Sequence, residues 1–439
     1  MSLVTEQAQH SIELPQPGKK LKFLVFPLGW VLAHVGRTVE IARELRSRGH
    51  EVVFAGSDPD HPQSKLDHAI EAGFKVVRVR EPRWDYAWER FQKYGGWIGV
   101  LDFFRSQKWA PLDLILEDII RVCREEEPDL LLGDSSVGVS TVGHIMGIPA
   151  AGVLNAYNGN FFRPGSFYHF LINNWDRFYW SRIRARVYRK HGVQPANAIN
   201  LLKKMPILSP DLPLFHNPHG EYPNWMPIGP IISEPPCNMP DWYHEMNDGT
   251  PNIYITMGST GLLDNLLRRS YEVLGKAAYR FVVTTGGQVS EATMAMAPSN
   301  FRFTTYAPGS KLMERCKAVV FHGGNGTMYQ ALAAGLPMVA LPSHLEQEEC
   351  VKLLLQQDFG IRRCSRRING ATMLQAIEEV LKNPVYSDAT RSFRDVVRNA
   401  RATERAANIL IHHALEGMSE NMQHDTQSAN VLYFPGVKA

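Results

Sequence analysis

Six consecutive residues, His322 to Thr327 (HGGNGT), combine a histidine, three glycines, an amide and a hydroxyl. An apolar strand pattern ends directly before them, and a helix pattern follows directly. Glycine lets the backbone approach an anion closely, and the free N–H groups at a helix start can hold it. Thr327 adds a hydroxyl and His322 adds a donor. The spacing therefore predicts a cradle for a diphosphate group.

The surrounding stretch, residues 318–347, reads in the order strand, glycine loop, helix, strand and acidic loop. Gly335-Leu336-Pro337 separates the helix from the second strand, and Glu346 and Gln347 lie in the acidic loop. The first 56 residues show a related alternation: KFLVFP predicts a strand, residues 34–48 a helix, and EVVFA a second strand. Such βαβ units imply a parallel sheet.

The alternation pauses in a proline-rich stretch, residues 206–240, and then restarts. We therefore predict an α/β fold with two Rossmann-like domains, whose ligands lie in a cleft beyond the carboxyl ends of the strands. The N-terminal domain is expected to span residues 21–231 and the C-terminal domain residues 232–415. Residues 1–20 are expected to form a flexible arm, and residues 416–439 a polar tail.

Composition narrows the class of protein. The chain has 439 residues, 44% hydrophobic and 21% charged, which is ordinary for a globular protein. A net charge of +3 gives no reason to expect a nucleic-acid partner. No apolar run approaches the roughly 20 residues of a membrane span, and no signal peptide follows Met1. The five cysteines form no C-x-x-C pair, so we expect a reduced, cytoplasmic protein.

The loop and its flanks resemble a known family. HGGNGT, Gln330-Ala331, Gly335-Leu336-Pro337 and Glu346-Gln347 are similar to the donor-binding signature of the GT-B-fold UDP-glycosyltransferase family. Arg48-Gly49-His50-Glu51-Val52 resembles the family's opening segment. The resemblance implies two facing domains, and transfer of a sugar from a UDP- or dTDP-linked donor to a small acceptor, with inversion of the anomeric centre.

The resemblance also implies donor-binding roles, residue by residue. The residues implied to hold the diphosphate are His322, Gly324, Asn325, Gly326 and Thr327, and those implied to close over it are Ser259 and Thr260. The residues implied to receive the nucleobase are Tyr306 and Ala307, while Gln330 would meet the ribose. The residues implied to read the sugar hydroxyls are Glu346 and Gln347.

Three positions depart from the family's pattern. Gln330 stands where a ribose-binding glutamate is usual, so a charge-assisted hydrogen bond is lost. Glu346 replaces an aspartate and is one methylene longer, which leaves the identity of the sugar open. Gly309 replaces a glutamine at the end of the base-contacting turn, which leaves open whether the base of the donor is uracil or thymine.

The reacting pair implied by the resemblance is His34 and Asp134. His34 lies after the first predicted strand at the start of a helix, where the helix dipole disfavours a positive charge and keeps the ring able to accept a proton. A carboxylate behind the ring fixes its tautomer and stabilises the imidazolium that forms. His322 and the helix start would stabilise the leaving diphosphate, so we expect no metal and no further cofactor.

Two aromatic stretches, residues 84–109 and 157–191, allow two interpretations. They either form the core beneath inserted helices or line an acceptor site for a flat or apolar molecule. The arginines interleaved in the second stretch could also contact a membrane surface, which we favour less. The alternatives to a transferase are a nucleotide-sugar epimerase and a non-catalytic nucleotide-sugar-binding subunit. The sequence does not distinguish a monomer from a homodimer.

Overall fold

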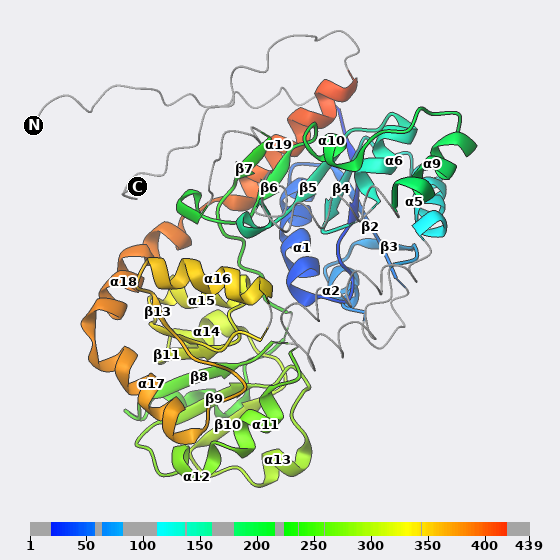
Figure 1. The fold of residues 1–439 in the computed structure, drawn as a ribbon. Helices are drawn as coiled ribbons and strands as arrows, with labels where there is room; N and C mark the ends of the chain where they lie inside the picture. Colours follow the sequence, from blue (N-terminus) through cyan, green and yellow to red (C-terminus); the bar gives the residue numbers. More distant parts are fainter. Residues whose placement is uncertain are drawn as a thin grey trace, which may run out of the picture.

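The computed structural model describes residues 19–57, 64–81, 112–136, 138–159, 180–215, 224–235, 237–258, 260–343 and 345–418. Two parallel sheets, each with helices on both faces, form two domains stacked one above the other (Figure 1). The predicted α/β class with two parallel sheets is confirmed. The predicted domain boundary at residues 231–232 falls in the connection between the two sheets.

The N-terminal sheet holds seven strands. They are β1 (Lys22–Phe26), β2 (Glu51–Gly56), β3 (Lys75–Arg78), β4 (Leu130–Asp134), β5 (Ala150–Val153), β6 (Ile207–Ser209) and β7 (Trp225–Pro227). Its helices are α1 (Leu32–Ser47), α2 (Asp67–Glu71), α5 (Leu112–Glu126), α6 (Val139–Met146), α9 (Ser181–Lys190) and α10 (Ala198–Leu202), with short 3-10 helices at Ala156–Asn158 and Pro213–Phe215.

The C-terminal sheet holds six strands. They are β8 (Asn252–Thr256), β9 (Arg280–Thr284), β10 (Phe301–Thr304), β11 (Cys316–Phe321), β12 (Met338–Ala340) and β13 (Gly360–Arg362). The helices that follow β7 are α11 (Leu263–Arg268), α12 (Tyr271–Leu274), α13 (Glu291–Ala295), α14 (Gly309–Met313), α15 (Asn325–Ala334), α16 (Leu345–Gln356), α17 (Gly370–Lys382), α18 (Pro384–Arg398) and α19 (Ala402–Met418), and the 3-10 helix Asp241–Asn247 precedes β8.

Both sheets reverse their strand order at one point. The N-terminal order is β3-β2-β1-β4-β5-β6-β7 and the C-terminal order is β10-β9-β8-β11-β12-β13. The loops after β1 and β4 therefore leave the first sheet side by side in opposite directions, as do the loops after β8 and β11 in the second. Such a switch point opens a crevice for ligands at the carboxyl ends of the strands.

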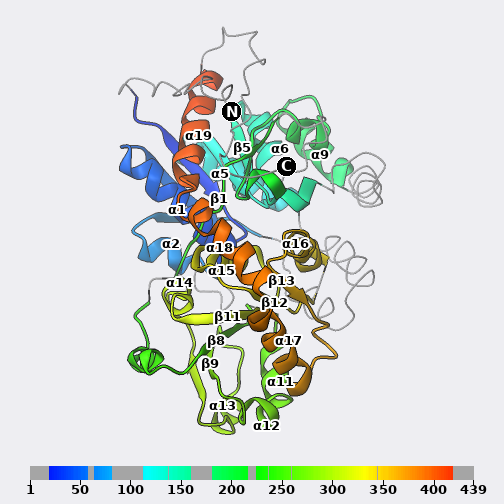
Figure 2. The same cartoon turned by 90° about the vertical axis from the view of Figure 1, so that its left-hand side faces the viewer.

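Buried apolar side chains line both faces of each sheet. In the N-terminal domain, α1 and α2 cover one face, and α5, α6 and α9 cover the other. The last helix, α19, was expected in the C-terminal domain, but it packs along α1 on the N-terminal domain (Figures 1 and 2). Its Ala402, Ala406, Leu410 and Ala414 form an apolar stripe at helical spacing that completes this core.

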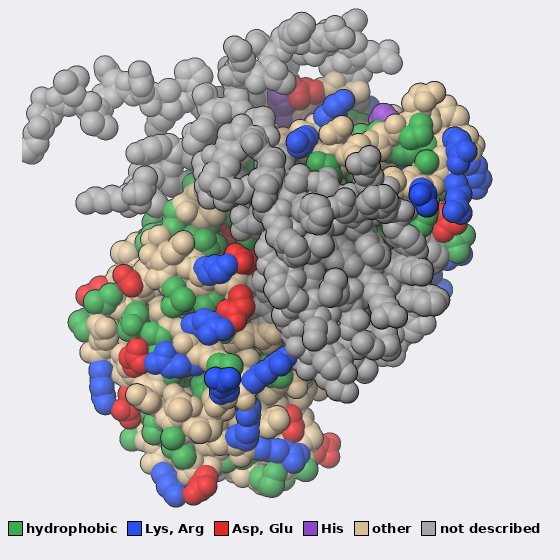
Figure 3. Space-filling view, viewed as in Figure 1, with side chains coloured by type: hydrophobic (Ala, Val, Ile, Leu, Met, Phe, Trp, Pro, Cys, Tyr) green, Lys and Arg blue, Asp and Glu red, His purple; other side chains and the backbone are tan. Residues whose placement is uncertain are grey.

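Several predicted features lie outside the described residues. They include most of the arm and the tail, most of both aromatic stretches, and Ser259. No helix within the described ranges is long and apolar enough to cross a membrane. On the face of the C-terminal domain in Figure 3, acidic and basic side chains are mixed. That mixture is typical of a solvated surface.

Candidate active site

His34 and Asp134 meet at the switch point of the N-terminal sheet. Phe26 of β1 pairs with Gly133 of β4, so Asp134 ends its strand beside the loop that leads from β1 into α1. His34 is the third residue of α1, one turn from the end of that loop. The chain order alone separates the two residues by 100 positions, and the parallel pairing brings them together.

The imidazole and the carboxylate form a hydrogen bond. Nδ1 of His34 lies 2.6 Å from Oδ1 of Asp134, whose side chain is fully buried. A buried carboxylate accepts, so Nδ1 carries the proton, and in the neutral ring Nε2 then has the lone pair. Nη2 of Arg37 lies 3.0 Å from the same Nδ1. Since Nη2 of Arg37 and Nδ1 of His34 then both carry protons, the two nitrogens lie close together without forming a hydrogen bond.

Arg37 holds the carboxylate from its other side. Its Nε donates to Oδ2 of Asp134, and its Nη2 donates to Oδ1 at 2.5 Å. Its Nη1 donates to Oδ1 of Asn155. Burial alone would raise the pKa of Asp134, but the charge of Arg37 and the hydrogen bonds from Arg37 and His34 outweigh it and hold that pKa below its ordinary value. The dyad of His34 and Asp134 is therefore held in place by a buried ion pair between Asp134 and Arg37.

We expect Asp134→Asn to destabilise the fold by about 3 to 5 kcal/mol at pH 7, because Arg37 would remain buried without its counter-ion. The folded pKa of Asp134 is depressed, so its contribution is complete above the ordinary value of 3.8 and is lost as pH falls further. Urea unfolding should show a gap between wild type and variant that narrows below pH 4. Glu44→Gln, which breaks the partly exposed ion pair with Arg48 on the same helix, should cost about 1 kcal/mol or less. Equal losses for the two variants would contradict the buried pair.

The glycine loop lies at the switch point of the second sheet. Phe321 of β11 pairs with Thr256 of β8, and α15 starts with Gly324 as its N-cap. The His322 ring lies between two glycines: a Cβ atom at Gly258 would come within 2.9 Å of it, and one at Gly324 would collide with Nε2. At Gly326, a Cβ atom would meet no atom within 4 Å apart from the neighbouring residues and backbone of its own helix. The loop thus combines a fixed imidazole with an open helix start, as an anion cradle requires.

Asn325 and Thr260 were both predicted to contact the diphosphate, but their side chains form hydrogen bonds within the protein. Nδ2 of Asn325 donates to Oδ1 of Asp211 at 2.9 Å, which leaves its backbone N–H for an anion. Thr260 is buried, and its hydroxyl donates to the carbonyl of Met257 at 2.8 Å. Thr327 is half-buried in the first turn of α15. The diphosphate roles of these three residues remain predictions.

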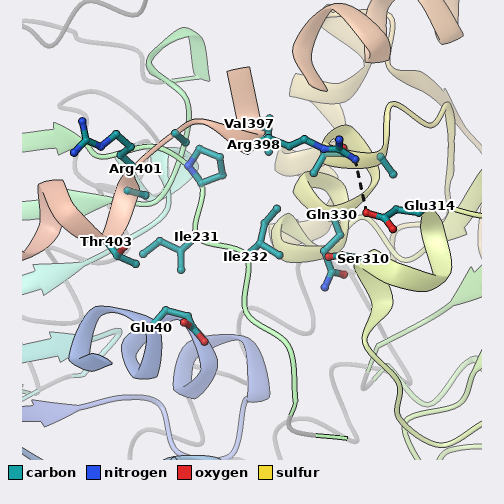
Figure 4. Close-up of a pocket in the computed structure, with 15 residues that line it drawn as sticks. Glu40, Ile231, Ile232, Ser310, Glu314, Gln330, Val397, Arg398, Arg401 and Thr403 are labelled. Carbon is teal, nitrogen blue, oxygen red and sulfur yellow. Dashed lines mark hydrogen bonds and ion pairs between the residues drawn. The ribbon is translucent and has the colours of Figure 1, made fainter. Parts of the chain in front are cut away.

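The predicted nucleoside contacts lie around the turn after β10. Tyr306 is 38% exposed, which suits a ring that stacks on a base, and Ala307 is buried. The amide of Gln330 lies against Gly309, where a Cβ atom would come within 3.3 Å of Oε1. Gln330 and Ser310 also line a cavity of 430 Å³ between the two domains, where residues 230–232 and the α18–α19 connection pass from one domain to the other (Figure 4).

Glu346 and Gln347, which are predicted to bind the sugar hydroxyls, lie in the first turn of α16. Oε1 of Gln347 accepts hydrogen bonds from the backbone N–H of Ser343 at 2.9 Å and from its hydroxyl at 3.0 Å. That leaves Nε2 of Gln347 as the group able to donate to a sugar. Glu346 accepts a hydrogen bond from Tyr157, and burial, followed by the Glu346 charge, raises the pKa of Tyr157 well above its ordinary value. Because Tyr157 follows β5 and Glu346 follows β12, the carboxyl ends of the two sheets meet here.

Metal binding was not expected from the sequence. Across the described ranges, no group of three or more His, Cys, Asp and Glu side chains is placed to hold a metal ion.

Comparisons with known proteins show that the chain is similar to glycosyltransferases. Residues 272–412 match the family described as "Erythromycin biosynthesis protein CIII-like, C-terminal domain". A PGL/p-HBAD biosynthesis glycosyltransferase of Mycobacterium tuberculosis is 25% identical over 413 residues, which are 86% of this chain and 89% of that protein. The crystal structure of the glycosyltransferase SnogD from Streptomyces nogalater aligns with a TM-score of 0.69 and 20% identity, over 90% of this chain and all of that one.

The chain has the GT-B fold and is a glycosyltransferase. A third match, the glycosyltransferase VinC in complex with dTDP, aligns with a TM-score of 0.67 and 18% identity over 90% of this chain and all of VinC. This GT-B glycosyltransferase is a nucleotide-sugar-dependent enzyme. Likeness along nearly the whole chain favours transferase chemistry over the epimerase and the non-catalytic subunit.

Sequence reasoning did not single out three residues that the structure places beside the predicted site residues: Arg37, Asn155 and Asp211. Arg37 carried a usable signal, because it lies three residues after His34 and therefore on the same face of α1. Asp211 follows β6, a strand of three residues in the proline-rich stretch, where no period was visible. Its partners on α15, Asn325 and Tyr329, are more than 100 residues away in sequence, so no local pattern could identify these contacts.

Proposed function

We propose that this glycosyltransferase moves a sugar from a dTDP-sugar to a hydroxyl group of a small apolar or aromatic acceptor and inverts the anomeric centre. The hydrogen bond between His34 and the buried Asp134 carries the proposal, because it leaves Nε2 of His34 able to accept a proton. The dTDP complex of the structurally similar VinC supports thymine as the base. The acceptor class rests on the aromatic stretches of the sequence.

The two switch points supply different groups to the proposed reaction: His34 and Asp134 at the first, and the start of α15 with His322 at the second. Nε2 of His34 takes the proton of the acceptor hydroxyl while that oxygen attacks the anomeric carbon. The bond from the anomeric carbon to the diphosphate oxygen breaks, and its electron pair leaves with the diphosphate. Asp134 stabilises the imidazolium that forms, as in a hydrolase triad. The start of α15 and His322 stabilise the charge that builds on the leaving group.

The other predicted contacts position the donor. Tyr306 and Ala307 receive the base, Gln330 meets the ribose, and Glu346 and Gln347 read the sugar hydroxyls. Ser259 and Thr260 close over the diphosphate from the loop after β8. We propose these roles together, because the residues follow the carboxyl ends of β8, β10, β11 and β12 in one sheet.

A thermal-shift panel tests the donor. We expect dTDP and dTDP-sugars to raise the melting temperature more than UDP and UDP-sugars do, because the proposed site binds thymine nucleotides more tightly. Stabilisation grows with the ratio of ligand concentration to Kd and reaches about 2.7 kcal/mol at a hundredfold excess. ADP serves as a control for unspecific anion binding. A larger shift with UDP would contradict the choice of base, and the absence of a shift with any uracil or thymine nucleotide would contradict the donor site.

A further inference from the structure

Asp211 connects the two domains beside the glycine loop. It follows β6 of the N-terminal sheet and is 2% exposed. Its Oδ1 accepts hydrogen bonds from Nδ2 of Asn325 and from the hydroxyl of Tyr329, each at 2.9 Å, and both donors belong to α15. Its Oδ2 accepts from the backbone N–H of Ala156 at 2.7 Å and from the Ser209 hydroxyl at 3.4 Å. One carboxylate thus holds donors from both domains.

Tyr329 fixes the same junction from the C-terminal side. Its hydroxyl accepts a hydrogen bond from the backbone N–H of Leu212 at 3.0 Å while it donates to Asp211. Burial, followed by the charge of Asp211, raises the pKa of Tyr329 well above its ordinary value, so the hydroxyl stays protonated. Leu212 and Phe215 pack into the core of the C-terminal domain, where the rings of Phe215 and Tyr329 lie 6.3 Å apart.

In the N-terminal domain, hydrogen bonds connect Asp211 to His34 and Asp134. Ala156, which donates to Asp211, follows Asn155 directly in the chain. Asn155 is buried and accepts from Arg37, which in turn holds Asp134. A continuous path of hydrogen bonds and one peptide unit therefore runs from His34 to the first turn of α15.

We propose that Asp211 is a positioning residue, which sets the start of α15 at the distance from His34 that the transfer step requires. This inference rests on the proposed function, in which His34 takes the proton and the start of α15 holds the leaving diphosphate. In such a displacement, a misplacement of about 1 Å can lower the rate by a factor of about a hundred. Asp211 acts through its partners and does not itself bind the donor.

Tyr329→Phe tests the inference with little disturbance, because the ring and its packing are kept while the hydroxyl is lost. We expect kcat to fall about tenfold or more. We expect the Kd for dTDP, measured by calorimetry, to stay within about twofold, because a bound nucleotide contacts the C-terminal domain alone in the proposed site. Asp211→Asn should lower kcat at least as much, and the double variant should fall no further than Asp211→Asn.

Tyr271→Phe is the matched control. It removes another buried tyrosine hydroxyl from the C-terminal domain; Tyr271 is the first residue of α12 and packs in a different core cluster from α15, so the variant should leave kcat unchanged. A wild-type kcat for folded Tyr329→Phe, or losses in the double variant that multiply independently, would overturn the inference. If Asp211→Asn does not fold, Tyr329→Phe alone decides. Failure of the proposed function is distinguishable, because the unaltered protein would then form no glycosylated product.

Discussion

Replacing His34 with alanine is expected to lower kcat by a factor of about 10² to 10⁴ and to leave the Kd for dTDP nearly unchanged. The expected split follows from the two switch points. His34 belongs to the N-terminal sheet and would meet the acceptor, whereas the glycine loop belongs to the C-terminal sheet and would hold the nucleotide. Initial-rate kinetics and calorimetry on the same preparation measure the two quantities.

The control for His34→Ala is His412→Ala. His412 lies on the surface of α19 with 62% of its side chain exposed, and its loss should change neither quantity. Retained turnover in His34→Ala would remove His34 from the mechanism. A parallel loss of dTDP affinity would instead show that His34 belongs to the donor site.

The glycine loop gives the second large expected effect. Gly324→Ala should weaken dTDP binding by about ten- to a hundredfold, because its methyl group would push aside His322, and a charge-assisted hydrogen bond is worth about 1.5 to 3 kcal/mol. Gly326→Ala should also weaken dTDP binding strongly, but for another reason. Its methyl group meets no protein atom and would enter the space proposed for the diphosphate.

The two glycine variants control for each other. Gly324→Ala displaces a protein side chain, so its melting temperature should fall without ligand. The melting temperature of Gly326→Ala should stay near that of the wild type. Calorimetry that shows wild-type dTDP affinity for Gly326→Ala would refute the anion cradle, whatever the behaviour of Gly324→Ala.

Much of the fold could be predicted because it is encoded locally. The buried runs of β1, β4 and β11 and the loop at His322 each lie within a few consecutive residues, where periodicity and glycine placement are visible. The strands β6, β7 and β13 have three residues each, too few to show a period. β12 is equally short, but the Gly335-Leu336-Pro337 break directly before it made it predictable. The apolar stripe of α19 shows that one face is buried, but it does not show which domain that face covers.

The polar contacts between elements could not be predicted in the same way. His34 and Asp134 came from a family resemblance, and the hydrogen bond between them is visible only when the parallel pairing of β1 and β4 is known. α1 carries three arginines, and only the structure shows that Arg37 is the one buried against Asp134. Such partners are chosen by topology, because the strand order decides which loops become neighbours.

Product analysis with the unaltered protein tests the central claim most directly. The protein is incubated with an α-linked dTDP-sugar and a panel of phenolic acceptors, and the products are examined by mass spectrometry and proton NMR. We predict an acceptor that has gained one sugar, joined through a β linkage, together with free dTDP. An epimerised or hydrolysed dTDP-sugar without glycosylated acceptor, or a product with an α linkage, would contradict an inverting transfer at His34.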